Sequence, residues 1–228
     1  MTTPRKEKPV AKQPDTPPET GVRETIVRDI VRGLYDGRYE PGQRLPEAEL
    51  TSTYAVSRGP VREALNVLAA RNIVELTPQR GAQVRVLPIG EAIDTLVVAQ
   101  NLIGLAARLA ASNGDPAGRV RLEAALAKLS AFNPDADSAE YAIARDGFYG
   151  ALTALAANVQ LNRILPTVHI HLIRVQFRPV LRTTDASRHR DYQRIAEAVL
   201  AARPREAETA ARAHIERAIE KLRAFRGG

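Results

Sequence analysis

The feature that most constrains the fold is a change in hydrophobic pattern near residue 72. Before it, the apolar residues recur at helical spacing, whereas residues 73–77 and 83–87 are short and rich in β-branched side chains, as strands are. Residues 78–82 separate the two stretches and include Gly81, which can supply the positive φ of a tight turn. We therefore expect a β-hairpin at this point.

Three helices are expected before the hairpin. The first has apolar residues at helical spacing and closes at Asp36–Gly37; these residues are Ile26, Val27, Ile30, Val31 and Leu34. Residues 40–43 place Pro and Gly at the centre of a type II turn, and a second helix fits residues 47–54. The third begins at Ser57, a favoured N-cap residue, and runs to about Arg71. The order predicts a winged helix-turn-helix domain over residues 21–87.

The rest of the chain carries no strand signal. Residues 88–228 are Ala-, Leu- and Arg-rich helical stretches that break near residues 113–116, 133–134, 158, 183–185 and 203–204, which predicts an all-α bundle of about six helices. Residues 1–20 hold five of the 15 prolines and little that could be buried, so we expect a disordered tail. The predicted fold class is mainly α, with a winged helix-turn-helix followed by a helical bundle.

Composition excludes several functional classes. The chain has no cysteine, which rules out disulfide scaffolds, Cys-ligated metals and thiol nucleophiles, and it shows no catalytic motif, so we expect neither an enzyme nor a bound cofactor. No apolar run follows the N-terminal charges and no stretch resembles a membrane span, which predicts a cytoplasmic protein without a membrane partner. The net charge of +7 favours a polyanionic partner.

The third helix is the best candidate for contacting that partner. Arg58, Arg62 and Asn66 are four residues apart and share one face, while the opposite face is apolar. Arginine and asparagine side chains can read base edges in the major groove, and arginine also binds phosphate. The alternative is that these are ordinary solvated side chains on a surface helix.

The segments Tyr39–Leu50, Val56–Leu68 and Arg80–Val84 resemble the winged-helix domain of GntR-family transcriptional regulators. The resemblance implies that Arg58 and Arg62 contact operator DNA and that Ser57 approaches the DNA backbone. It also implies that the tip of the hairpin, at Arg80 and Gly81, enters the minor groove. Three departures are Gly59, where the family usually has a hydroxyl residue, Ala55, where it usually has Gly, and Ala48, where some relatives have an Arg that reads a base. The expected DNA-binding set is Arg44, Ser57, Arg58, Gly59, Arg62, Asn66, Arg80 and Gly81.

The helical half resembles the ligand-binding and dimerising domain of the FadR-like subfamily, called FCD. Many members bind a divalent metal through an Asp and three His, which helps to hold a carboxylate effector. By spacing, the matching positions here are Arg145, Tyr149, Tyr192 and His214, and a single imidazole is too little for a metal site. We therefore expect no metal, and an anionic organic effector held by these four side chains.

Simpler interpretations of these residues stay open. Arg145 could pair with Asp146 or Glu140 or extend to solvent, and Tyr149 and Tyr192 could be core aromatics. For the whole chain, the leading hypothesis is a homodimeric regulator, expected to be a repressor, that binds a pseudo-palindromic operator and responds to a small ligand. The alternative hypothesis is a DNA-binding dimer whose helical domain only dimerises.

Overall fold

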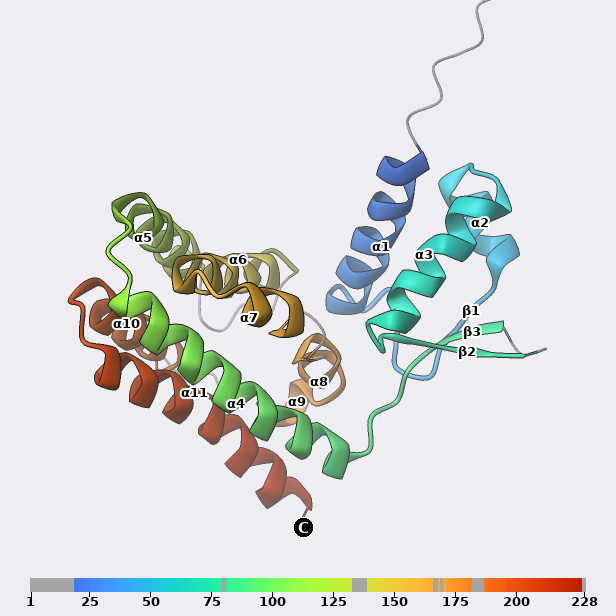
Figure 1. The fold of residues 1–228 in the computed structure, drawn as a ribbon. Coiled ribbons are helices and arrows are strands. Elements are labelled where there is room, and N and C mark those ends of the chain that lie inside the picture. Colours follow the sequence, from blue (N-terminus) through green and yellow to red (C-terminus); the bar gives the residue numbers. More distant parts are fainter. Residues whose placement is uncertain are drawn as a thin grey trace, which may run out of the picture.

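The structure is a computed structural model that describes residues 19–78, 81–132, 139–165, 168, 170–181 and 187–226 of the 228-residue chain. It has two parts, a small mixed part followed by a larger helical part (Figure 1). The predicted fold class is therefore confirmed. The expected disordered tail lies outside the described residues, apart from residues 19 and 20, which already belong to the first helix.

The described residues of the N-terminal part form three helices and three short strands. In chain order these are α1 (Glu19–Tyr35), β1 (Arg44–Leu45), α2 (Glu47–Tyr54), α3 (Arg58–Ala70), β2 (Val74–Thr77) and β3 (Gly81–Val84). The second helix has the expected bounds, and α3 starts one residue after its N-cap Ser57. Its apolar face, which includes Val61, Leu65 and Leu68, is buried and contacts α1.

The sheet is antiparallel in the order β1-β3-β2, with Gly81 opposite Thr77 and Ala82 opposite Leu45. Gly81 has φ +78°, as the hairpin requires. The second strand of the hairpin was expected at residues 83–87, which is wrong: β3 spans Gly81–Val84, and Arg85 N donates one more hydrogen bond, to Ile73 O at 2.9 Å, before the chain leads into the helical part. The turn at residues 40–43 closes with Gln43 N donating to Glu40 O at 3.0 Å, and it directs β1 onto β3.

The helical part contains eight helices within the described residues, more than the six expected. They are α4 (Ile89–Ser112), α5 (Pro116–Ser130), α6 (Ala139–Ala156), α7 (Val159–Ile164), α8 (Ile170–Gln176), α9 (Arg178–Leu181), α10 (Ser187–Leu200) and α11 (Pro204–Arg226). Three expected breaks occur where the residues dictate them: Asp115 and Asn158 cap α5 and α7 through their side chains, and Pro204 opens α11.

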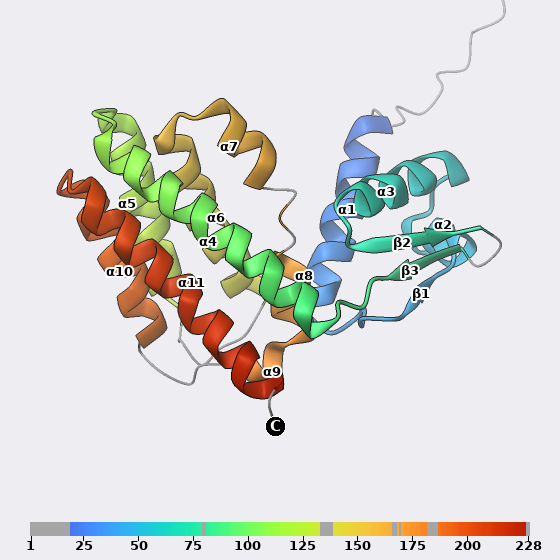
Figure 2. The ribbon, with the colours of Figure 1, turned by 60° about the horizontal axis from the view of Figure 1, so that its bottom comes forward.

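Helix α4 is the centre of the bundle. It packs along α11 and also contacts α6 and α10, and the two long helices lie side by side in both views (Figures 1 and 2). By length and composition α4 could cross a membrane, but half of its most apolar window is buried inside the fold, so its apolar character serves the core.

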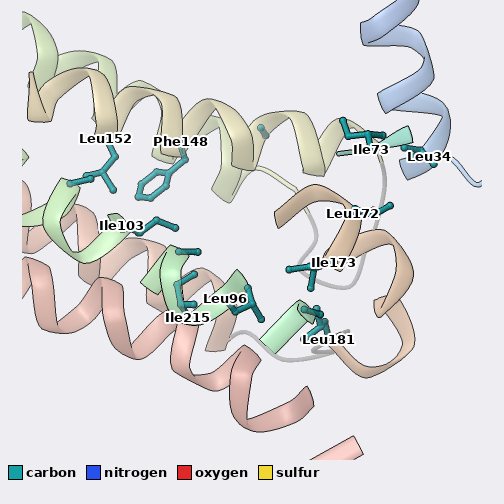
Figure 3. Packing of buried hydrophobic residues seen from close by; sticks show 14 of the residues in the cluster. Leu34, Ile73, Leu96, Ile103, Phe148, Leu152, Leu172, Ile173, Leu181 and Ile215 are labelled. Atoms are coloured by element: carbon teal, nitrogen blue, oxygen red, sulfur yellow. The ribbon is translucent and has the colours of Figure 1, made fainter. Parts of the chain in front are cut away.

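The two parts share one buried apolar cluster. Leu34 of α1 and Ile73 belong to the same cluster as Leu172 and Ile173 of α8 (Figure 3). Hydrogen bonds also cross the boundary, since Leu87 N donates to the Gln176 side chain at 2.8 Å and Gln176 Nε2 donates back to Leu87 O at 2.6 Å. The N-terminal part is thus seated on α6, α8 and α9.

Candidate functional site

The polar face of α3 is fully available to a partner. Arg58, Arg62 and Asn66 are exposed on the side of the helix opposite its buried face, as the four-residue spacing predicts. Together with the flanking strands, the helix forms a groove of about 690 Å³ whose lining includes Arg62, Asn66 and Gly81. The structure therefore brings the third helix and the hairpin to one surface.

Arg62 is oriented by an acidic residue that sequence reasoning missed. Its Nε donates to Glu47 Oε1 at 3.1 Å, and Glu47 is the first residue of α2. The Arg62 side chain is largely exposed and that of Glu47 is partly exposed, so solvent screens the pair and it adds little stability. The pair instead sets the direction of the Arg62 side chain, because it holds the guanidinium over the groove. Sequence reasoning could not find this contact, since no periodic signal links two residues fifteen positions apart.

The start of α3 exposes Ser57 and Gly59, two residues expected to lie near the DNA backbone. Ser57 takes an extended N-cap conformation, but its hydroxyl makes no capping hydrogen bond and is exposed. A Cβ added to Gly59 would meet only Ser57 Oγ, at 4.0 Å, so this position faces open space. Arg44, on β1, is exposed as well. Arg80 lies outside the described residues.

The second candidate site is a pocket of about 220 Å³ in the helical part. Helix α6 supplies the largest share of its wall through Arg145, Tyr149 and neighbouring residues. Ile103 of α4 and Arg174 of α8 complete it, with apolar residues from the segment after α7. The pocket therefore combines two arginines with a largely apolar body.

Two of the four expected pocket residues line this space, and the other two lie directly behind it. The Tyr149 and Tyr192 rings are 6.0 Å apart edge to face, and the Tyr192 ring is 4.8 Å from the His214 imidazole. Tyr192 and His214 are buried and are not among the lining residues. The four predicted residues are thus neighbours, but only Arg145 and Tyr149 line the pocket, whereas Tyr192 and His214 are buried behind them. The sequence did not distinguish these two pairs.

His214 is held by a carboxylate that sequence reasoning missed. Its Nδ1 lies 3.0 Å from Asp191 Oδ2, and Arg217 forms an ion pair with the same carboxylate. Burial lowers the pKa of His214, so the imidazole is neutral at pH 7. Burial alone would raise the pKa of Asp191, but the hydrogen bonds from His214 and Arg217 outweigh this effect, and the pKa of Asp191 lies below its ordinary value. The Nδ1–H therefore donates to Asp191 and the Nε2 lone pair faces the aromatic cluster.

Several polar atoms of this cluster have no hydrogen-bond partner among the residues that the structure describes. They are the hydroxyls of Tyr149 and Tyr192, His214 Nε2 and Arg174 Nε. Burial, reinforced by the neighbouring Tyr192, raises the pKa of Tyr149 well above its ordinary value, so its hydroxyl keeps its proton. Each buried unpaired group costs about 1–3 kcal/mol, and such groups call for a partner.

Arg145 is buried rather than extended to solvent. Its Nη2 donates to the Tyr35 hydroxyl at 3.0 Å and lies 3.5 Å from Asp146 Oδ1. Glu140, the other expected partner, instead accepts from Arg32 at 2.8 Å. Sequence reasoning missed Tyr35 and Arg174, because they come from α1 and from a seven-residue helix that carry no pattern pointing to this pocket.

The described residues contain no group of three or more His, Asp or Glu side chains placed to hold a metal ion. The donors that line the pocket include the guanidinium N–H groups of Arg145 and Arg174 and the hydroxyl of Tyr149. These groups suit an anion better than a divalent cation.

Comparison with known proteins matches this architecture. Residues 22–84 match the family described as bacterial regulatory proteins, gntR family, and residues 94–217 match the FCD domain. The chain is 27% identical over 199 residues to the uncharacterized HTH-type transcriptional regulator BphR of Paraburkholderia xenovorans, covering 84% of this chain and 81% of that one. It is 33% identical over 89 residues to the HTH-type transcriptional repressor GlaR of Escherichia coli, covering 39% of each.

Solved structures show the same fold. McbR/YncC of E. coli superposes with a TM-score of 0.76 at 19% identity, covering 90% of this chain and 98% of that one. A GntR transcriptional regulator from a Rhodococcus species superposes with a TM-score of 0.73 at 21% identity, with the same coverage. With both domains matched in order, the chain is a DNA-binding transcriptional regulator and not an enzyme, and it belongs to the GntR family, in the group that carries an FCD domain.

Proposed function

We propose that the protein is a homodimeric repressor that binds a pseudo-palindromic operator and whose affinity for DNA is set by an anionic organic ligand in the FCD pocket. The proposed division is a winged-helix domain to residue 87 and an effector-binding domain from residue 88. The protein would act in the cytoplasm, where its DNA is.

The observation that carries the DNA-binding proposal is the shared surface of α3 and the hairpin. Arg58, Arg62 and Asn66 are exposed on one face, and the groove beside them reaches Gly81 at the hairpin. A helix that presents such donors can enter the major groove while the hairpin contacts the adjacent groove or backbone. Two copies related by a twofold axis would read two half-sites. Exposed Val97 and Val98 on α4 offer apolar area for contact between copies.

The test of this proposal is selection of duplexes from a random library with the purified full-length protein. We expect an inverted repeat to be enriched, and the mass of the complex to correspond to two chains per duplex. Enrichment of a single unrepeated site at one chain per duplex would contradict the dimer. No enrichment at all would contradict sequence-specific binding.

The ligand part of the proposal rests on the unpaired polar atoms around the pocket. The lining residues Tyr149 and Arg174 hold donors without partners among the described residues, and Arg145 lies at the same wall. A carboxylate accepts several such donors at once, with strong hydrogen bonds because donor and acceptor are both charged at the arginines. The apolar lining, which includes Ile103, Leu165 and Ile170, suits an aromatic or aliphatic body.

A thermal-shift titration separates this proposal from the alternative, in which the helical domain only dimerises. Benzoate is the probe, and benzamide has the same ring without the charge. We expect stabilisation by benzoate alone, because only a bound ligand raises the melting temperature, and we expect Tyr149→Phe to reduce it. Equal, negligible shifts with both compounds would favour the purely dimerising domain.

A further inference from the structure

We infer that Tyr35, the last residue of α1, is the point at which the FCD pocket acts on the winged-helix domain, because its hydroxyl and an anionic ligand compete for the guanidinium of Arg145. This inference rests on the proposed ligand pocket and names the route by which that pocket is coupled to the DNA-binding domain.

Tyr35 belongs to the winged-helix domain but is buried in the helical one. Only 4% of it is exposed, and it packs with Ala142 of α6 and Val175 of α8 in a small cluster separate from the main core. Arg178 of α9 donates a hydrogen bond to its backbone carbonyl. The C-terminal end of α1 is thus seated among three helices of the FCD domain, next to α8 in the ribbon view (Figure 1).

Arg145 makes two kinds of contact with this tyrosine. Its Nη2 donates to the hydroxyl at 3.0 Å, and its guanidinium carbon lies 5.6 Å from the centre of the ring, within the range of a cation–π contact. Both partners are buried, so the contact is shielded from water and salt. The exposed ion pair between Arg32 and Glu140 also crosses the boundary, but solvent makes it weak.

The same arginine forms a wall of the ligand pocket. Arg145 and its neighbour Asp146 line the 220 Å³ pocket, while Tyr35 and Asp146 line a groove of about 780 Å³ between α1 and α6. The guanidinium therefore lies between the space for the ligand and the end of α1. Because its five N–H donors lie in one rigid plane, turning the guanidinium toward the pocket moves Nη2 away from the Tyr35 hydroxyl.

A carboxylate in the pocket would win this competition. Burial raises the pKa of Tyr35 to about 12, so its hydroxyl is neutral and is a weaker acceptor than an anion. Drawing Arg145 into the pocket removes the hydrogen bond and the cation–π contact that hold Tyr35, at the end of α1, against the FCD domain. The hydrogen bonds between Leu87 and Gln176 lie at the connection and stay in place, so the winged-helix domain would pivot there.

The test measures the distance between the two domains. The chain has no cysteine, so spin labels at Ser52→Cys on α2 and Ser130→Cys on α5 attach only there, both at exposed positions. Labelled chains are diluted with unlabelled protein so that distances within one chain dominate. The variant is Tyr35→Phe, which keeps the ring and removes the hydroxyl. The matched control is Tyr54→Phe, whose hydroxyl donates to Asp29 inside the winged-helix domain.

For wild type we expect a narrow distance distribution that benzoate broadens or shifts. Tyr35→Phe should already be broad without benzoate and should bind benzoate about two- to tenfold more tightly, the range that one net hydrogen bond provides. The Tyr54→Phe control should behave as wild type. Benzoate-induced thermal stabilisation without any change in distance, or a Tyr35→Phe protein that responds as wild type does, would overturn this inference alone. Benzoate that neither stabilises the protein nor moves its domains would refute the proposed pocket together with the inference.

Discussion

Replacing Ala55 by Gly should stabilise the protein, because Ala55 is held in a conformation that L-amino acids avoid. It follows α2 and begins the turn into α3, with φ 52° and ψ 44°. Its amide donates to Ser52 O at 3.3 Å and that of Val56 donates to Thr51 O at 3.2 Å, so the turn cannot relax without losing these bonds. Left-handed geometry costs an alanine about 1–2 kcal/mol.

Glycine removes this cost but has more backbone freedom to lose on folding, about 0.4–1 kcal/mol. Because the Ala55 methyl group is exposed, its removal forfeits little packing. The expected net gain is about 0.5–1 kcal/mol, which corresponds to a rise of about 1–4 °C in the melting temperature of a chain this long. Thermal and urea melts followed by circular dichroism measure it.

The matched control is Ala124→Gly, an exposed alanine inside α5 in ordinary helical geometry. The same substitution there should lower the free energy of unfolding by about 1 kcal/mol. Changes of opposite sign in the free energy of unfolding at the two positions would support the strain at Ala55. An Ala55→Gly protein as destabilised as Ala124→Gly would show that the turn does not strain this residue.

Three further predictions concern the two sites. Gly59→Thr should tighten operator binding about two- to tenfold by adding a hydroxyl in open space, whereas Gly59→Val should give no gain in the same titration. The lowered pKa of His214 means that the unfolded chain binds a proton that the native state does not, so stability should fall as the pH drops below about 6.5. His214→Gln should make that slope shallower in melts between pH 7 and 5, and an unchanged slope would argue against the assignment. Elemental analysis of protein purified without chelator should find no stoichiometric metal, and one zinc, nickel or manganese ion per chain would refute the anionic pocket.

The sequence predicted the elements whose residues carry their own local signal. The α2 bounds, the positive φ of Gly81 and the break at Asn158 follow from turn and cap chemistry that acts within a few residues. Strand β1 was missed because two residues have no periodicity, and only its pairing with β3 creates it. Helical structure was expected between the breaks near residues 158 and 183, but the three short helices α7, α8 and α9 were not distinguished, since helices of one or two turns are specified mainly by packing.

The same division applies to the candidate sites. Arg58, Arg62 and Asn66 share one helix, so their common face could be derived from spacing. The contacts from Glu47 to Arg62 and from Tyr35 to Arg145 join elements far apart in the chain, and only the fold brings them together. Long-range polar pairs of this kind leave no pattern in one sequence.

The most direct test of the account is a titration of the selected operator with Arg62→Ala and, in parallel, Arg121→Ala. Both changes remove one exposed, ion-paired arginine, the first on α3 and the second on α5. If α3 reads the DNA, Arg62→Ala should lose about 1–3 kcal/mol of operator binding, while Arg121→Ala binds as wild type does. Unchanged operator affinity in Arg62→Ala, or an equal loss in both variants, would contradict the claim that this helix recognises the operator.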